Sequence, residues 1–367
     1  MRNFLSFITL MVWSTCMLQA QSTFKAQVLD KETNEPVPFA HVVCGETTTV
    51  TNTSGEFIIS PTEEGRIHIS FVGYQPYSIS TTKQIPDIIY LEQSLIQLDA
   101  VTITTGNSIM REFWNRKIMN YDMEPYWTTS YYKEKLIKSG ELTYLAEGVL
   151  DILKPANVNE DGVKISPIKT RKVIAPDFTL DPVYIQGNAY DMVVSSIWRE
   201  NSFISKSELK HYEFTYDGKQ TYGNKNVYIV SFQPATGKGY VSGRLFINDD
   251  DYAIVKMEYT PDSSESDFWE FVKWEEEFEF HNGSYVLSSV RYYGSYLDLG
   301  EKCDFEAILV NNHVSKENLA AFPNSEFQQK DIFLKEATSD FNDSYWESFN
   351  YLKLTEQELV GNNLLAE

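Results

Sequence analysis

Acidic and aromatic residues between positions 269 and 277 are the strongest candidates for chemistry in this sequence. Glu275 and Glu277 alternate with Glu276 along a predicted strand, so they share one face and could act as the two carboxylates of a glycoside hydrolase. Trp269 and Trp274 lie close by in the sequence and could stack on a sugar ring. No second carboxylate across a cleft can be identified, and an exposed, charged sheet face explains the same pattern. A carbohydrate-active enzyme is therefore kept as an alternative.

The other common catalytic patterns are absent from the sequence. None of the histidines belongs to an HxxE or HExxH pair, so a zinc peptidase is not expected. The histidines are His41, His68, His211, His281 and His313. Ser242 of the GYVSG segment lies one position away from the serine of a GxSxG elbow. The ATGKG segment at 235–239 lacks the spaced glycine and the Ser/Thr of a phosphate loop.

Three consecutive aspartates, Asp249–Asp251, could supply oxygen ligands for calcium. They lie where a hairpin must turn and lack the spaced Asp/Asn-Gly-Glu loop of a dedicated calcium site, which favours a solvated turn. The sequence thus predicts no catalytic, cofactor-binding or metal-binding residue.

The composition excludes one large class of function. The chain has 367 residues and a formal net charge of −21, from 31 basic and 52 acidic residues. Such a chain repels nucleic-acid phosphates and anionic head groups, so a general nucleic-acid binder is excluded. Aromatic residues make up 14% and favour strands. Cys44 and Cys303 lie far apart in the sequence and are expected to be separate buried thiols.

Residues 1–20 have the pattern of a signal peptide. Arg2 precedes an apolar run over 4–12 that is too short to span a bilayer, and cleavage is expected after Ala20. Lipid attachment at Cys16 is the alternative, although the residues before it form a poor lipobox. No later stretch is apolar enough for a membrane helix. We therefore expect an exported protein, periplasmic or associated with the outer membrane.

Short alternating segments predict a β-sandwich over residues 21–95. Phe24, Ala26 and Val28 point one way along the first strand. Further strands are expected within 37–44, 51–60, 66–74 and 88–91, separated by polar turns and without a helical pattern.

Four ordered patches in this region carry a family resemblance. They are Val28-Leu29-Asp30 with Thr33, Glu35-Pro36-Val37-Pro38-Phe39-Ala40, Thr51-Asn52 with Gly55-Glu56-Phe57, and Ser70-Phe71-Val72-Gly73-Tyr74. Over about residues 22–93 the chain resembles the carboxypeptidase-regulatory-like domain of Bacteroidetes envelope proteins. The resemblance implies a transthyretin-like sandwich of seven strands, without a peptidase. Asn52 stands where the family commonly has Asp, which weakens any cation-binding role.

After a linker at 96–107, residues 108–367 are expected to form an α+β domain. The spacing of Ile109, Phe113 or Trp114, and Ile118 predicts an amphipathic helix over 108–121. Strands are predicted at 128–137 and 142–153, a loop or excursion at 155–181, and an ambiguous segment that could be helical at 191–204.

Residues 211–310 are predicted to form a long antiparallel meander. Its strands are joined by Gly/Asn/Asp-rich turns, including Asn282-Gly283, and one face is aromatic and aliphatic while the other is polar. Such a sheet must curve around something, and the 108–121 helix is a candidate plug. The segments 228–232, 243–248 and 253–255 resemble the strands of Lol-type lipoprotein carriers. That resemblance implies a half-barrel with an apolar cavity for acyl chains.

The predicted fold class is therefore mainly β: a transthyretin-like sandwich, then a larger curved, half-barrel-like antiparallel sheet with one or two packed helices. The leading functional hypothesis is a non-enzymatic envelope binding or scaffold protein that holds a lipid, lipoprotein or peptide on the concave face of the large sheet. The predicted ligand-binding residues are Trp269, Phe271, Trp274, Tyr228, Phe232 and Phe246. The alternative to ligand binding is an interaction module that docks on an outer-membrane partner through an edge strand of the sandwich.

Overall fold

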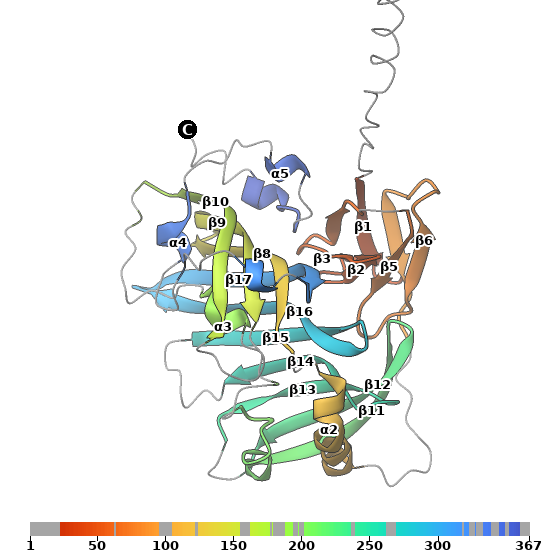
Figure 1. The fold of residues 1–367 in the computed structure, drawn as a ribbon. Coiled ribbons are helices and arrows are strands. Elements are labelled where there is room, and N and C mark those ends of the chain that lie inside the picture. Colours follow the sequence, from red (N-terminus) through yellow and green to blue (C-terminus); the bar gives the residue numbers. More distant parts are fainter. Residues whose placement is uncertain are drawn as a thin grey trace, which may run out of the picture.

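The computed structural model describes most of the chain. The described residues are 23–61, 64–94, 105–121, 124–154, 162–176, 178, 188–193, 197, 202–235, 239–261, 269–317, 319–322, 327, 333–338, 345–348 and 352–359. The predicted signal peptide with Cys16 lies outside them, as does most of the predicted linker. The fold is mainly β, as the sequence predicts (Figure 1).

The N-terminal unit is a seven-stranded sandwich, as the family resemblance implies. Its strands are β1 (Phe24–Asp30), β2 (His41–Cys44), β3 (Thr47–Val50), β4 (Glu56–Ile59), β5 (Arg66–Ser70), β6 (Tyr77–Ser80) and β7 (Ile88–Leu91). They form one sheet in the order β4-β1-β7 and a second in the order β3-β2-β5-β6. Side chains of both sheets, such as Val28 and Ile67, are buried between them. The strands β3 and β6 are not expected from the sequence, because their Thr- and Ser-rich segments are typical of turns.

The large unit is a single antiparallel sheet of ten strands, and it is curved and not closed. The strand order is β10-β9-β8-β17-β16-β15-β14-β13-β12-β11. The bounds are β8 (Tyr126–Lys138), β9 (Glu141–Lys154), β10 (Lys164–Ile174), β11 (Tyr212–Tyr222), β12 (Lys225–Pro234), β13 (Val241–Asn248), β14 (Ile254–Pro261), β15 (Trp269–His281), β16 (Ser284–Asp298) and β17 (Glu301–Ser315). The pairing of β17 with β8 joins the predicted meander to the earlier strands.

The strand β10 corrects one prediction. The sequence suggested a loop at 155–181, because this stretch is polar and contains several prolines. The structure instead places Lys164–Ile174 at the edge of the sheet, paired with β9. A register shift between Pro167 and Lys169 accommodates the proline. Proline has no backbone N–H to donate, and an edge strand tolerates this because it pairs with a neighbour on one side.

Helix α2 (Gly106–Asn120) packs on one face of the sheet, which we call the inner face (Figure 1). It begins with a capping box, in which the Thr105 and Ser108 side chains bind each other's backbone N–H. Ile109 and Phe113 are buried as predicted, but Ile118 is 72% exposed. Lys117, one residue earlier, takes the buried position, because a period of 3.6 residues places it directly after Phe113.

Other short elements cover the inner face beside α2. They are α3 (Ala189–Val193), η2 (Leu209–His211) and α4 (Phe333–Glu336). Two more short elements are η3 (Leu319–Ala321) and α5 (Tyr345–Ser348), and Trp346 of α5 packs on the opposite face of the sheet. Phe333 of α4 contacts Tyr132 with ring centroids 4.7 Å apart. Residues of α2, of α3 and of the segment before η2 all join one buried cluster with the sheet. The inner face is thus packed largely by the chain itself.

The opposite, outer face of the sheet carries the sandwich and the C-terminal segment. Strand β3 lies against β17, and Val50 shares a buried cluster with Tyr131, Trp346 and Leu352. His41 Nε2 lies 3.0 Å from the Ser288 hydroxyl. Cys44 and Cys303 are buried in the two different units and form no disulfide, as predicted.

Candidate functional site

Two of the predicted ligand-binding residues, Trp269 and Trp274, meet on the inner face. Trp274 stacks on Tyr292 with centroids 4.4 Å apart, and Trp269 contacts the same tyrosine edge-on at 5.8 Å. On the other side, Tyr259 lies parallel to Trp274 at 6.4 Å. We call these four rings, Tyr259, Trp274, Tyr292 and Trp269, the aromatic shelf. All four are partly exposed, so a ligand can reach the shelf.

The two tyrosines of the shelf are not among the predicted site residues. The signal for them was the Tyr-rich alternation of the two neighbouring strands, but only the strand pairing brings the rings together. The Tyr259 hydroxyl also donates to Glu276 Oε1 at 2.8 Å. Burial raises the pKa of Tyr292 above its usual range, so this phenol is neutral at physiological pH. The shelf can therefore stack on apolar or planar groups, with a carboxylate at its border.

The remaining four predicted residues divide between the faces. Phe232 and Tyr228 also point to the inner face but are covered by the chain; Phe203 stacks on Phe232 at 4.7 Å. Phe246 pairs in register with Lys256 and Ile229 on the outer face, where it is buried. Phe271 is 46% exposed on the outer face and contacts Tyr293. The predicted set therefore does not form one site.

The carboxylates proposed for glycoside chemistry lie on the outer face and are engaged by cations. Glu277 Oε1 accepts from Lys256 Nζ at 2.7 Å, and Glu275 lies 3.1 Å from Lys273. The two tryptophans that could stack on a sugar are on the inner face, with the sheet between them and these carboxylates. The geometry therefore does not bring Glu275 and Glu277 to the shelf.

Glu275 and Glu277 belong to a row of ion pairs that crosses the outer face. We call this row the ion-pair ladder; its members are Arg171, Glu147, Lys133, Lys135, Glu358, Glu306, Arg291, Glu275, Lys273, Glu258, Lys256 and Glu277. Arg291 Nε, for example, donates to Glu306 Oε1 at 2.7 Å. The sandwich covers part of the ladder, because the Phe39 ring lies 3.8 Å from the Arg291 guanidinium and the Phe71 ring lies 4.9 Å from Lys256 Nζ.

The ladder makes the folded state sensitive to acid. Burial opposes ionisation of Glu258, but Lys256, Lys273 and Arg244 outweigh it and lower its pKa to about 2. Burial is likewise outweighed at Glu358 by Lys133 and Lys135, which lower its pKa to about 2.

We therefore expect a steep loss of stability at low pH. Because these folded-state pKa values lie below the unfolded value of about 4.5, the stabilisation is present above pH 4.5 and is lost as the pH falls towards 2. Thermal unfolding followed by circular dichroism between pH 7 and pH 2 measures this. A midpoint that stays constant down to pH 2.5 would contradict the assigned pairs.

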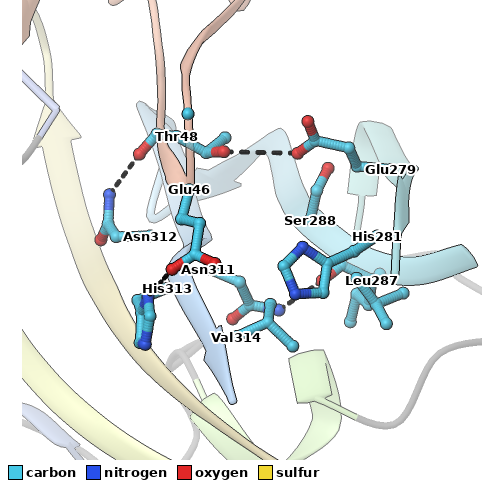
Figure 2. Close-up of a pocket in the computed structure, with 12 residues that line it drawn as sticks. Glu46, Thr48, Glu279, His281, Leu287, Ser288, Asn311, Asn312, His313 and Val314 are labelled. Carbon is cyan, nitrogen blue, oxygen red and sulfur yellow. Dashed lines mark hydrogen bonds and ion pairs between the residues drawn. The ribbon is translucent and has the colours of Figure 1, made fainter. Parts of the chain in front are cut away.

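A small cavity lies at the junction of the sandwich and the sheet (Figure 2). Thr48 of β3 bridges it, donating to Glu279 Oε2 at 3.3 Å and accepting through its carbonyl from Asn312 Nδ2 at 2.6 Å. His313 lies 3.9 Å from Glu46 at its rim. The cavity volume of about 30 Å³ is enough for a water molecule but far too small for a substrate, so this is a docking contact between the units.

The three aspartates at 249–251 serve the turn between β13 and β14. Asp251 Oδ1 accepts from the Ala253 N–H, its Oδ2 accepts from the Tyr285 hydroxyl, and Asp249 pairs with Lys219. Within the described residues, no three His, Cys, Asp or Glu side chains gather closely enough to hold a metal ion. No helix among these residues is both long and apolar enough to cross a membrane.

Comparison with known proteins identifies the first unit. Residues 24–103 match the CarboxypepD_reg-like domain family. The sandwich is a carboxypeptidase-regulatory-like domain. This confirms the resemblance drawn from the four sequence patches, whereas no curated protein matches the chain.

Solved structures similar to the chain are distant. A putative outer-membrane lipoprotein-sorting protein domain from Vibrio parahaemolyticus has 10% identity and a TM-score of 0.31, covering 63% of this chain and 98% of that one. A DUF1329 family protein from Desulfovibrio piger has 10% identity and a TM-score of 0.29, covering 58% of this chain and 94% of that one. At such values, function has to be argued from this chain's own geometry.

Proposed function

We propose that this is a non-catalytic binding or scaffold protein of the cell envelope, periplasmic or outer-membrane-associated, that holds a lipid, lipoprotein or peptide on the inner face of its large sheet. The observation that carries the proposal is the aromatic shelf. Four adjoining rings lie partly open on a face that the chain covers in large part with its own helices and segments.

The chemistry of the shelf favours the apolar part of a ligand. Each ring offers a flat apolar surface, and covering it removes apolar area from water at about 25 cal/mol per Å². Glu276 accepts a hydrogen bond from the Tyr259 hydroxyl of the shelf, whereas the cations Lys256 and Lys273 lie on the opposite face, paired with carboxylates. The shelf is therefore suited to acyl chains or to apolar side chains of a peptide rather than to an anionic head group.

Native mass spectrometry of protein purified gently from an envelope fraction tests the proposal. We expect a bound mass that disappears on organic extraction. Trp274→Ala should remove most of that mass, because Trp274 is the ring flanked on both sides in the shelf. Phe271→Ala is the matched control, since it removes an aromatic ring of the same strand from the outer face and should leave the bound mass unchanged. Equal loss in both variants, or a bare polypeptide in the wild type, would contradict the proposal.

A second candidate function, docking through the sandwich, is favoured by the edge strand β7. This strand is an edge of the three-stranded sheet, and its outward side chains Ile88 and Tyr90 are 42% and 45% exposed. An apolar edge strand can accept a strand from a partner. Ile88→Lys with Tyr90→Lys should abolish recovery of an outer-membrane partner without lowering the thermal midpoint. Unchanged recovery would exclude β7 as the docking edge.

A further inference from the structure

Two buried lysines of β8 share one carboxylate from the far end of the chain. Lys133 Nζ and Lys135 Nζ lie 3.0 and 2.6 Å from the same oxygen, Glu358 Oε1. The Lys133 and Glu358 side chains are only 2% and 1% exposed. In the described part of the chain, Glu358 supplies the one carboxylate that forms an ion pair with Lys133. The two lysines thus form a receiving site for an anion, and the C-terminal segment fills it.

The charges of the sheet itself leave this site one anion short. Among the described residues, the cations gathered here are Lys133, Lys135, Arg171 and Arg291, and the carboxylates paired with them, other than Glu358, are Glu147, Glu306 and Glu275. Glu275 is also shared with Lys273. Burying an unmatched ammonium is costly, so this part of the outer face requires a carboxylate from elsewhere.

The segment that supplies the carboxylate binds in the manner of a short peptide. Leu352 enters the cluster of Tyr131, Val149 and Ile308, and Leu354 enters a second cluster beside it. Glu358 is held in place by Thr355, whose N–H donates to Glu358 Oε2 at 2.8 Å. Two leucines spaced by two residues and a carboxylate four residues later therefore make up the recognised pattern.

The sandwich completes the site. Asn52 Nδ2 donates to the Lys353 carbonyl at 3.0 Å, while Asn52 Oδ1 accepts from the N–H groups of Ser54 and Glu56 in its own turn. An aspartate at position 52 could serve the turn but could not donate to the segment. The Asn at this position thus lets the sandwich hold the segment by its backbone, independently of the segment's side chains.

We propose that the outer face beneath residues 352–359 is a docking site for an acidic, leucine-bearing peptide of a partner protein, and that the chain's own C-terminal segment occupies it as an intramolecular competitor. The proposal is independent of the inner-face function, because the two sites lie on opposite faces of the sheet. The partner's peptide carries the pattern of the occupant: two leucines at i and i+2 and a carboxylate at i+6. The tethered segment competes at an effective concentration of about 1 mM. Release of the segment therefore controls access.

The test uses the full chain and a capped, labelled peptide of residues 352–359 as the probe. In Glu358→Gln, trypsin should cut after Lys353 at least about tenfold faster than in the wild type, because cleavage requires the segment to open. Fluorescence anisotropy should show the peptide binding this variant at least about tenfold more tightly than the wild-type chain, where the tethered segment competes. A peptide with Gln in place of the glutamate should not bind.

Leu354→Ser is a second variant that separates opening of the segment from a folding defect caused by loss of the buried charge. It removes a buried apolar contact of the segment and leaves Glu358 in place. It should show the same faster cleavage and the same peptide binding. If the protein forms dimers at high concentration and the peptide dissociates them, the site is also supported. The segment of a second copy then occupies it. If the segment stays protected in both variants, or if it opens and the peptide does not bind while circular dichroism is unchanged, the proposal is wrong.

Discussion

Replacing Lys256 with methionine is expected to lower the free energy of unfolding by about 3–5 kcal/mol at neutral pH. The Lys256 side chain is 2% exposed, and its Nζ lies 2.7 Å from Glu277 and 3.7 Å from Glu258. Removing the ammonium leaves the Glu277 carboxylate buried beneath the sandwich, with His41 Nε2 3.3 Å from Glu277 Oε2. Urea unfolding at pH 7.5 measures the loss.

Three controls define that result. At pH 4 the difference from wild type should shrink, because the stranded carboxylate can take up a proton. The double variant Lys256→Met with Glu277→Gln should recover most of the stability, since both charges are then gone. Lys302→Met, which breaks a pair whose lysine is 58% exposed, should change stability by less than about 1 kcal/mol. Equal effects of Lys256→Met and Lys302→Met would show that the ladder does not hold the outer face together.

Replacing Phe113 with alanine is expected to cost about 3–5 kcal/mol and to loosen α2 from the inner face. The Phe113 ring is fully buried and contacts Trp114 and Tyr121 edge-on, with centroids 5.8 and 6.3 Å away. The cavity that alanine leaves lies between the helix and the sheet. Chemical denaturation measures the loss, and hydrogen exchange of residues 106–120 locates it.

The same helix offers a matched control. Ile118→Ala also shortens an apolar side chain, but at a position that is 72% exposed. The free energy of unfolding should therefore change by no more than about 0.5 kcal/mol. Binding of an environment-sensitive dye should increase in Phe113→Ala only, because the uncovered inner face is aromatic. Slow, unchanged exchange of 106–120 in Phe113→Ala would mean that other contacts hold the helix. The hydrogen bonds from Arg116 and Asn120 to the Asp250 and Asp251 carbonyls would then be the anchors.

The two faces of the large sheet differ in chemistry. The inner face is aromatic; the chain buries much of it, and the four rings of the shelf are among the partly exposed residues. The outer face carries the ion-pair ladder and binds the sandwich and the C-terminal segment. Because Glu275 and Glu277 lie on the face opposite the tryptophans, the geometry does not support the glycoside-hydrolase alternative that was built on these residues.

Local pattern alone predicted much of this fold. The alternation over 211–310 predicted the meander, and the Asn282-Gly283 turn has the positive φ values of 47° and 96° that such a turn requires. The ordered patches at Val28, Glu35, Thr51 and Ser70 predicted the sandwich that the family match identifies. These signals act between near neighbours in the chain, so they can be read without the rest of the structure.

The site depended on features that no local pattern contains. Along β15, strict alternation would place Trp269 on the same face of the sheet as Phe271 and on the face opposite to Trp274. A bulge between Trp269 and Phe271 inserts one extra residue and moves Trp269 to the inner face beside Trp274. Because side chains on a strand repeat every two residues, a one-residue insertion exchanges the faces.

Contacts between residues that are far apart in the sequence depend on the tertiary structure alone. Glu358 meets Lys133 across 225 positions, Asn52 meets Lys353 across 301, and β10 forms only because β9 offers it an edge. The sequence by itself determined most of the strands, although not β3, β6 or β10, and it determined where the meander turns and that a regulatory-like sandwich comes first. Which face each aromatic occupies, and which charges are buried together, depend on bulges and on contacts between distant segments. Those are set by packing and charge compensation over the whole fold rather than by any short stretch of residues.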